Sequence, residues 1–233
     1  MFLFYDPFFG ETHPTLNKEE SHHCLHVLRH KTGDTIQVTD GKGTLYTAMI
    51  TITGKQGCTV EIVAKESHTL PPHKTHIGIA PPKSMDRMEW FVEKATELGL
   101  QEITPLLCTF SERNKINSEK LEKKAISAVK QSKNLFKPSI HPFKKISDFS
   151  TGYKHDCNKF IATLNKDSSA LLSSMPLPFQ ETIVIVGPEG GFDNREIEQA
   201  FEYGFKPVSL GNHILRTETA GITAVVMMNA ASF

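Results

Sequence analysis

The sequence shows no excess of either charge and contains few cysteines. Its 26 Lys and Arg residues balance 26 Asp and Glu residues, so the formal net charge is zero. A protein that coats nucleic acid indiscriminately would carry a large positive charge instead. The four cysteines, Cys24, Cys58, Cys108 and Cys157, form no CxxC pair. This scatter is typical of reduced, packed thiols in a cytosolic protein and argues against a disulfide framework or a zinc site.

Long hydrophobic runs are also missing. The apolar residues 1–5 have no basic segment and are followed by Asp6 and Pro7, so we interpret them as a strand and not as a signal peptide. The longest apolar stretch, residues 220–233, is too short and too rich in small residues to span a bilayer. We therefore expect a cytoplasmic protein with no membrane role.

What is present is the composition of an ordinary globular protein. Hydrophobic residues make up 39% and charged residues 22% of the 233 positions, values that are typical of folded domains. A chain of this length accommodates one small and one medium-sized domain, each with its own core. We expect two domains.

The first 70 residues predict a small domain made of β-strands. Glycine-containing turns separate predicted strands at residues 35–40, 44–53 and 58–65. In the second of these, one buried face is predicted by the alternating residues Tyr46, Ala48, Ile50 and Ile52. Short strands at this spacing favour a small β-barrel, followed by a proline-containing linker at residues 67–74.

From residue 75 onward, strands and helices alternate, which is the pattern of an α/β domain with a largely parallel sheet. We expect strands at residues 77–80, 103–110, 160–164, 182–186 and 208–210. Helices are expected at residues 86–98, 118–132 and 218–231, and another is opened by a capping-box pair, Asp193 and Glu196. The last helix is apolar on nearly all sides, so we expect it to be buried in the domain or in a subunit interface.

Positive charge is concentrated in one segment. Residues 113–145 contain ten Lys or Arg against only Glu119 and Glu122, and such asymmetry favours a basic surface that faces a polyanion. A solvated helix face is the alternative. Lys83 and Arg87, just before the first helix of the second domain, fit either surface ion pairs or RNA contact.

Two loops could bind a ligand, because each follows an apolar strand. In open α/β sheets, ligands bind at the carboxyl ends of the strands. The first loop, residues 187–192, has three glycines around Pro188, which let backbone groups approach an adenine or a ribose closely. It is neither a P-loop nor a dinucleotide-binding fingerprint, and a plain structural turn is an equal alternative.

The second loop, residues 211–220, brings polar groups to the start of the last helix. Thr217 or Thr219 could be the N-cap, and Glu218 could simply complement the helix dipole. Arg216 is harder to explain structurally. We interpret it as a fixed positive charge aimed at a phosphate, a carboxylate or an oxyanion.

A histidine-rich segment stands near the amino terminus. His22 and His26 have the i, i+4 spacing that can bind a metal, but no carboxylate partner is evident, so we expect no metal. His23 and Arg29 better fit contacts with RNA or support of the first domain.

Five segments together resemble, in order and spacing, the RsmE family of ribosomal RNA small subunit methyltransferases. They are HHCLHVLR (22–29), KSMDRME with KATELG (83–89 and 94–99), SER (111–113), IVGPEGG (185–191) and LGNHILRTETA (210–220). Each motif alone is weak, but five in register over essentially the whole chain are highly specific.

The resemblance implies a fold and an activity. It implies a PUA-like RNA-binding β-barrel at residues 1–70 and a SPOUT α/β methyltransferase domain with a deep trefoil knot at residues 74–233. It also implies a homodimer that uses S-adenosyl-L-methionine, without a metal, to methylate N3 of a specific uridine in 16S rRNA of the small ribosomal subunit.

The resemblance further assigns roles to single residues. Cofactor contacts fall on Leu164, Val186, Gly187, Glu189, Gly190, Leu210, Gly211, Ile214, Leu215 and Ala220. Catalytic and substrate roles fall on Arg113, Arg216 and Glu218. Beside these, the residues themselves favour RNA contacts at His23, Arg29, Lys83 and Arg87, and Lys133 is a further expected RNA contact. The family often has an arginine just after the Gln131–Ser132 pair, where this chain has Lys133 and Asn134.

The chemistry of uracil N3 explains these assignments. N3 is a poor nucleophile until its proton leaves, after which negative charge spreads onto O2 and O4. The enzyme therefore needs alignment of N3 with the methyl group, a proton acceptor such as Glu218, and a positive group such as Arg216 or Arg113. Because N3 lies on the Watson–Crick edge, the target base must be unpaired or extruded.

Two other functions remain open at this point. A noncatalytic RNA-binding or ribosome-assembly module would use the barrel and the basic surface, and its glycine loops would be only turns. A small-molecule α/β enzyme would bind an adenine nucleotide at residues 187–191 without any dependence on RNA.

Overall fold

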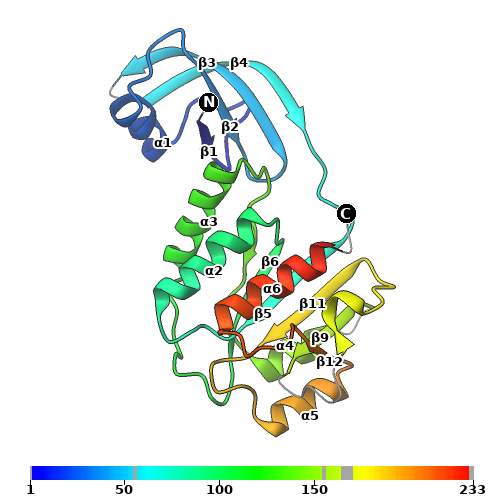
Figure 1. The fold of residues 1–233 in the computed structure, drawn as a ribbon. Coiled ribbons are helices and arrows are strands. Elements are labelled where there is room, and N and C mark those ends of the chain that lie inside the picture. Colours follow the sequence, from blue (N-terminus) through cyan, green and yellow to red (C-terminus); the bar gives the residue numbers. More distant parts are fainter. Residues whose placement is uncertain (1, 55–56, 154–155, 164–169, 231–233) are drawn as a thin grey trace. The chain divides into compact units, whose positions relative to one another are not determined.

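The computed structural model describes the chain except residues 1, 55–56, 154–155, 164–169 and 231–233 (Figure 1). It forms two compact units. Unit 1 comprises Met1–Leu70 and Ile126–Lys137, and unit 2 comprises Pro71–Ala125 and Pro138–Phe233. One boundary between the units therefore falls inside helix α3 (Ser118–Ser132).

Unit 1 is built on a four-stranded sheet. Its strands, in spatial order, are β1 (Leu3–Tyr5), β2 (Thr35–Thr39), β3 (Thr44–Gly54) and β4 (Gly57–Ser67). β1 pairs with β2 in parallel and the other pairs are antiparallel. The strands predicted from the alternating pattern are confirmed. The helical turns α1 (Lys18–His22) and η1 (His23–Val27) were not predicted.

The buried face of β3 is shorter than the sequence pattern predicts. Tyr46, Ala48 and Ile50 are buried, but Ile52 is 62% exposed. The pairing of β3 with β4 shifts register between Ile50 and Ile52, and such an irregularity turns the following side chains away from the core. The prediction for Ile52 is therefore wrong.

Residues 126–137 are held to the rest of unit 1 by specific bonds. Lys130 Nζ lies 2.6 Å from Glu20 Oε1. The backbone N–H of Gly43 donates to the Leu135 carbonyl at 3.0 Å, and that of Lys137 donates to the Gly41 carbonyl at 2.9 Å. A segment distant in sequence thus belongs to this unit.

Unit 2 contains a sheet of eight strands in its described residues, and every pairing is parallel. The spatial order is β10-β12-β9-β11-β5-β6-β7, and β8 pairs with β6. The strands are β5 (Lys74–Ile79), β6 (Glu102–Leu107), β7 (Ser139–Ile140), β8 (Lys144–Lys145), β9 (Asn158–Ala162), β10 (Ala170–Leu171), β11 (Glu181–Val186) and β12 (Lys206–Ser209). The five strands predicted here are confirmed, whereas the two-residue strands β7, β8 and β10 were not predicted.

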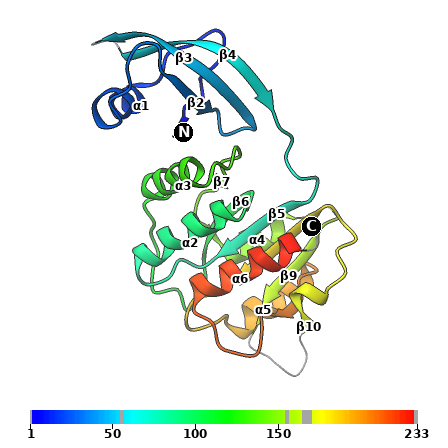
Figure 2. The ribbon, with the colours of Figure 1, turned by 45° about the horizontal axis from the view of Figure 1, so that its top comes forward.

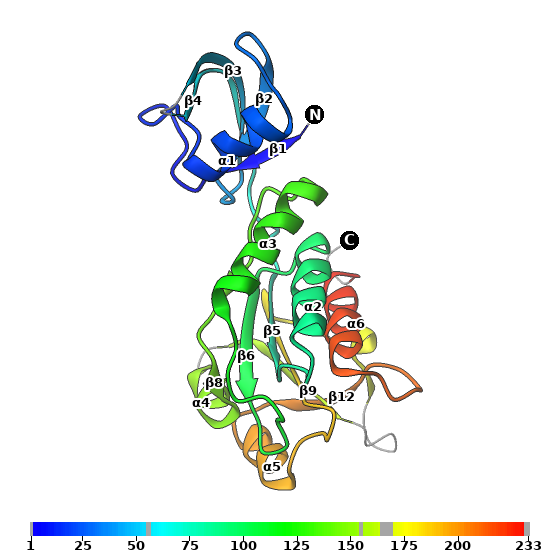
Figure 3. The ribbon, with the colours of Figure 1, turned by 90° about the vertical axis from the view of Figure 1, so that its left-hand side faces the viewer.

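Helices cover both faces of this sheet, as the α/β pattern predicts (Figure 3). One face packs against α2 (Met85–Glu97) and α6 (Thr217–Ala230), and the other against α4 (Ile146–Gly152) and α5 (Asn194–Glu202). Side chains of a strand alternate between the two faces. Accordingly, Ile77 and Ile79 belong to the first core, and Ala80 belongs to the second.

Two helices have the features predicted from the sequence. Asp193 and Glu196 form the predicted capping box at the start of α5. α6 is apolar along nearly its whole length. α2 and α6 lie side by side on the sheet (Figure 2). Among the described residues, no helix has the length and apolar character needed to cross a membrane.

A buried polar cluster lies at the amino ends of β5 and β6. His76 is 1% exposed, and its ring packs edge-on against Phe149 of α4. Burial lowers the pKa of His76 to about 3, so its imidazole is neutral near pH 7. Burial opposes ionisation of Glu102, but Lys74 together with His76 and His141 outweighs that effect, and the pKa of Glu102 lies below its usual value.

Candidate active site

A cavity of about 410 Å³ opens at the carboxyl ends of three neighbouring strands of unit 2. Its walls come from the ends of β9, β11 and β12 and from the segments that follow β11 and β12. They are formed by Ala162, Thr163, Val186, Gly187, Pro188, Glu189, Gly190, Gly191, Phe192, Asn194, Ile197, Ser209, Leu210, Gly211, His213, Ile214, Leu215, Thr217 and Ala220. This is the place where open α/β sheets bind ligands, and the volume suits a small organic molecule.

The cavity brings together the residues predicted to contact a cofactor. Leu164 lies outside the described residues. All the others line the cavity: Val186, Gly187, Glu189, Gly190, Leu210, Gly211, Ile214, Leu215 and Ala220. Two glycine loops that are separated by about one helix and one strand in sequence thus share one concave surface.

One hydrogen bond joins the two loops, and another closes the first loop on itself. Thr217 Oγ1 donates to the Gly187 carbonyl at 3.1 Å, so the start of α6 is tied to the first loop. Gly191 has a φ of +77° and its N–H donates to the Pro188 carbonyl at 2.9 Å, which closes a tight turn. The first loop is therefore a structural turn as well as part of the cavity wall.

Close packing explains the glycine at position 187. A Cβ atom there would lie 3.0 Å from the Phe192 ring, within the same loop. Phe192 and Ile197 also pack on the core beside α5. Sequence reasoning included Phe192 in the candidate ligand loop without giving it a cofactor contact, and it gave no ligand role to Asn194 or Ile197. The position of α5 just after that loop was the available signal.

The backbone of one residue, Lys83, connects the cavity wall to Arg113. The Lys83 N–H donates to Glu189 Oε1 at 3.1 Å, and the Lys83 carbonyl accepts from Arg113 Nη2 at 2.7 Å. The Lys83 ammonium lies 2.8 Å from Glu112 Oε2, and this partner raises the pKa of Lys83. Arg113 thus stands one residue behind the cavity wall and does not line it.

Glu218 is buried at the first turn of α6 and is 7% exposed. Its Oε1 lies 3.6 Å from Arg87 Nε, and its Oε2 has no hydrogen-bond partner among the described residues. A carboxylate is favoured at a helix amino terminus, but a buried oxygen without a partner is unusual. One lone-pair site of Glu218 is therefore available.

Arg216 is exposed on the loop just before α6. Within the part of the chain that the structure describes, its side chain makes no hydrogen bond or ion pair. None of the three predicted catalytic residues lines the cavity. Arg216 and Glu218 flank the lining residue Thr217, and Arg113 binds the Lys83 carbonyl behind the wall.

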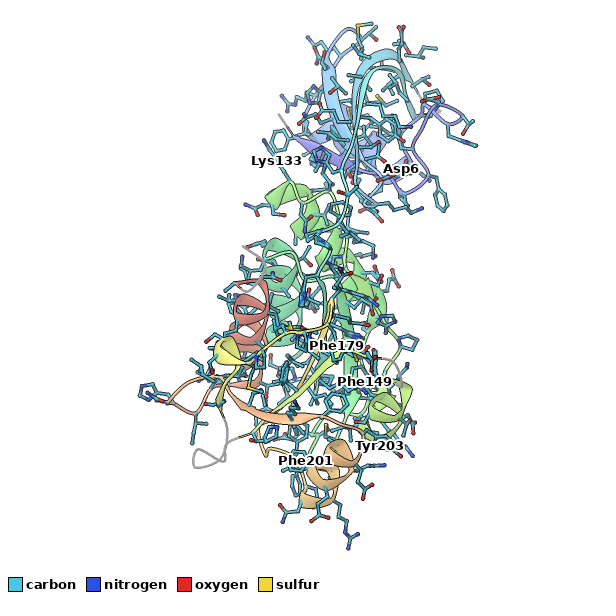
Figure 4. All side chains as sticks on the ribbon, turned by 90° about the vertical axis from the view of Figure 1, so that its right-hand side faces the viewer. Asp6, Lys133, Phe149, Phe179, Phe201 and Tyr203 are labelled. Carbon is cyan, nitrogen blue, oxygen red and sulfur yellow. The ribbon has the colours of Figure 1, made fainter. Side chains whose placement is uncertain are left out.

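The predicted RNA contacts divide between the two units. Lys83 and Arg87 in unit 2 each have a carboxylate partner. In unit 1, Arg29 and Lys133 are both exposed and both have φ of +58°; Lys133 is labelled in Figure 4. A side chain in this left-handed region costs roughly 1 kcal/mol, so two basic residues are held in strained backbone.

His23 is partly exposed in unit 1. Its ring lies edge-on to Phe4, and its Nδ1 is 3.9 Å from Glu20 Oε2. The His22 and His26 rings are 4.8 Å apart, but they do not belong to any group of three ligands among the described residues.

Ion pairs reduce the charge of the basic segment. Four of its lysines lie next to carboxylates: Lys120 with Glu89, Lys123 with Glu119, Lys124 with Glu93, and Lys130 with Glu20. The alternative of a solvated and paired helix face therefore accounts for much of α3, and the remaining free positive charge is smaller than the sequence count.

Comparison with known families supports the class that this site defines. The family model of an RNA methyltransferase domain matches residues 69–229, and that of an RNA methyltransferase PUA domain matches residues 16–63. The chain therefore combines a PUA domain with a parallel sheet that has a cavity at the carboxyl ends of its strands. With the two family matches, this combination places the chain in the class of RNA methyltransferases.

Relatives narrow this class. The ribosomal RNA small subunit methyltransferase E of Rickettsia conorii is 33% identical over 89% of this chain and 85% of its own length. That of Bacillus subtilis is 30% identical over 91% of this chain and 87% of its own length. The chain belongs to the ribosomal RNA small subunit methyltransferase E family.

Solved structures agree. A probable rRNA methyltransferase from Porphyromonas gingivalis superposes with a TM-score of 0.90 at 36% identity, covering 99% of this chain and 98% of that one. The ribosomal RNA small subunit methyltransferase E of Neisseria gonorrhoeae, solved bound to S-adenosyl methionine, has a TM-score of 0.87 at 29% identity, with the same coverage.

Proposed function

We propose that this chain transfers the methyl group of S-adenosyl-L-methionine to N3 of a specific uridine in 16S rRNA of the small ribosomal subunit. The observation that carries the proposal is the single cavity at the sheet edge, which gathers every described residue assigned to the methyl donor. The Neisseria gonorrhoeae relative bound to this donor supports the assignment.

The cavity walls fit the chemistry of the donor. Leu210, Ile214 and Leu215 supply apolar surface for an adenine ring, and Gly187 and Gly190 expose backbone groups for its polar edge and the ribose. Glu189 adds a carboxylate on the cavity wall, and its Lys83 bond fixes its position. Leu164 would complete the wall. When bound, the donor supplies an electrophilic methyl group on its sulfonium, and no metal is part of this proposal.

The charged residues around the cavity would handle the proton and the developing negative charge of the base. Glu218 has a buried oxygen without a partner, which suits it to accept the N3 proton. Arg216 has a free guanidinium, which suits it to stabilise charge on O2 or O4. Arg113, held by the Lys83 carbonyl, is the second candidate for that role.

The two parts of the chain would divide the work on RNA. We assign residues 1–70 to a PUA-like RNA-binding barrel and residues 74–233 to a SPOUT domain with a deep trefoil knot. The matches to an RNA methyltransferase PUA domain and an RNA methyltransferase domain support the division into an RNA-binding part and a catalytic part. His23, Arg29, Lys83, Arg87 and Lys133 would contact the RNA backbone. Lys133 would replace the arginine often found in the family, and the target uridine would be unpaired or extruded.

We further propose a cytoplasmic homodimer that uses the outer faces of α2 and α6. Trp90 on α2 is 43% exposed, Leu98 directly after α2 is 40% exposed, and Val226 on α6 is 48% exposed. The two helices lie side by side (Figure 2), so these apolar side chains belong to one face of the unit. Exposed apolar surface of this kind favours a protein interface.

The test combines donor binding with product mapping. Purified protein is incubated with labelled S-adenosyl-L-methionine and small subunits from a strain that lacks the modification, and mass spectrometry locates the methyl group. We expect one methyl on uracil N3. Calorimetry with S-adenosylhomocysteine should detect binding. Subunit binding without donor binding would replace the enzyme with a noncatalytic assembly factor, and donor binding without any RNA product would favour a small-molecule enzyme.

A further inference from the structure

A second group of possible ligands lies away from the cavity, at the amino ends of the strands in unit 2. His76, Glu102 and His141 each offer one ligand atom, and these atoms lie within 4.8 Å of one another. Glu102 Oε2 is 3.2 Å from His76 Nδ1 and 3.0 Å from His141 Nε2. Tetrahedral zinc places its ligand atoms roughly 3.3 Å apart, given bonds of about 2.0–2.1 Å.

Strand register explains why the three side chains meet. His76 of β5 pairs with Glu102 of β6, and His141 follows the last residue of β7, which pairs with Ile103. Residues in adjacent strands that face the same side of a sheet are neighbours. The group lies under α4, whose Phe149 packs on the His76 ring and is labelled in Figure 4.

The hydrogen bonds of His76 direct one nitrogen toward Glu102. Its Nε2 is 2.8 Å from Thr104 Oγ1, and its Nδ1 is 2.8 Å from the Tyr153 hydroxyl. In the tautomer whose Nε2–H donates to Thr104, Nδ1 carries the one lone pair of the ring and lies 3.2 Å from Glu102 Oε2 and 2.8 Å from the Tyr153 hydroxyl. A cation bound between Nδ1 and Oε2 attracts both atoms, and it takes the Nδ1 lone pair that accepts from the Tyr153 hydroxyl when no cation is bound.

The hydrogen bonds that hold the three side chains also resemble those around a metal site. Metal-bound histidines usually form a hydrogen bond through their other nitrogen, as His76 does with Thr104. Glu102 Oε1 is held by Lys74 Nζ at 2.8 Å, so the Oε2 atom points to the histidines. His76 is buried, whereas the His141 side chain is 35% exposed and gives access from solvent.

We propose that His76 Nδ1, Glu102 Oε2 and His141 Nε2 bind one divalent cation of the zinc class. Two imidazoles and one carboxylate form a ligand set that zinc accepts. The site lies at the opposite ends of the strands from the donor cavity, so the cation joins β5, β6 and the segment after β7 and stabilises unit 2. This role does not depend on the proposed methyl transfer.

The test uses the full-length protein and zinc chloride. Protein stripped with a chelator is titrated by calorimetry, and bound metal is counted by mass spectrometry after gel filtration. We expect one zinc ion per chain and a higher melting temperature. Cobalt chloride should give the visible absorption of a tetrahedral site. Less than about a tenth of an ion per chain at micromolar zinc would overturn the proposal.

Matched variants locate the ion. His141→Ala, at the partly exposed ligand, should abolish zinc binding and the gain in melting temperature while leaving circular dichroism unchanged. The variant with both His22→Ala and His26→Ala removes the other close histidine pair and should bind zinc like the wild type. Zinc binding that survives His141→Ala, or that disappears in the His22/His26 variant, would place the ion elsewhere and refute the site.

Discussion

At the scale of single residues, Arg216 carries the electrostatic part of the proposed mechanism. Its side chain is exposed and unpaired within the described part of the chain, so its removal should not disturb the fold. We expect Arg216→Ala to lower the rate of methyl transfer by about 10²- to 10³-fold, the usual loss when one group that stabilises an oxyanion is removed. Single-turnover kinetics on modification-free small subunits measure this rate.

The control for Arg216 is another exposed arginine, Arg195 on α5. Arg195→Ala should transfer methyl groups like the wild type, and both variants should bind S-adenosylhomocysteine normally. Undiminished transfer by Arg216→Ala would remove this residue from the mechanism and leave Arg113 as the candidate.

The proposed role of Glu218 as the acceptor of the N3 proton can be tested by substitution. The change Glu218→Gln preserves the shape of the side chain but removes the carboxylate, so the melting temperature should change little. We expect a loss of about 10²- to 10⁴-fold in the single-turnover rate, which is the range for a general base. Donor affinity should remain the same. A variant that keeps the wild-type rate and pH profile would show that Glu218 only positions Arg87.

At the scale of secondary-structure elements, the packing of α6 on α2 depends on Gly221. A Cβ atom at this position would lie 2.6 Å from Phe91 and 3.0 Å from Ile79. Alanine in place of glycine stabilises a helix by about 1 kcal/mol, but overpacking a dense core costs about 1–3 kcal/mol. We expect Gly221→Ala to reduce the free energy of unfolding by about 1 kcal/mol, measured by urea denaturation.

Gly152, at the end of α4, is the control for this change. A Cβ atom there would meet no heavy atom within 4 Å, so Gly152→Ala should leave the free energy of unfolding within about 0.5 kcal/mol of the wild type. Equal effects at the two positions would mean that the contact between α6 and α2 does not limit the size of residue 221.

The proposed homodimer forms through the outer faces of α2 and α6. A charge placed in an apolar interface is left without a partner and weakens binding strongly. We expect the double variant Trp90→Glu and Val226→Glu to sediment as a monomer where the wild type sediments as a dimer. Both side chains are about half exposed in the single chain, so the variant should fold. A wild-type monomer at micromolar concentration would contradict the dimer.

At the scale of the whole molecule, the proposed function assigns RNA recognition to the first unit and catalysis to the second. The variant Arg29→Asn with Lys133→Asn removes two exposed cations but keeps a residue that tolerates the left-handed backbone. We expect weaker binding to small subunits and a shallower dependence on salt. Each lost phosphate contact lowers the slope of log K against log salt by about 0.7–0.9.

Donor binding provides the control for this variant. The affinity for S-adenosylhomocysteine should stay at the wild-type value, because the cavity belongs to unit 2 alone. An unchanged salt slope would mean that Arg29 and Lys133 contact no phosphate.

The sequence alone determined the longer elements and pointed to two candidate ligand loops. Strict alternation predicts β3, the β-branched run predicts β11, and the Asp193–Glu196 pair predicts the start of α5, because each is set by neighbours along the chain. The assignments to the two glycine loops came from the family resemblance, and apart from Leu164, which the structure does not describe, all their residues line one cavity.

Only the tertiary structure decided the contacts between distant segments. The ion pairs of Lys120, Lys124 and Lys130 and the placement of residues 126–137 in unit 1 depend on partners far away in sequence. The register shift that exposes Ile52 depends on how β3 pairs with β4. The His76, Glu102 and His141 group is the clearest case. Its members are separated by more than twenty residues, and the order of parallel strands brings them together, because pairing in such a sheet is set by the whole fold and not by local spacing.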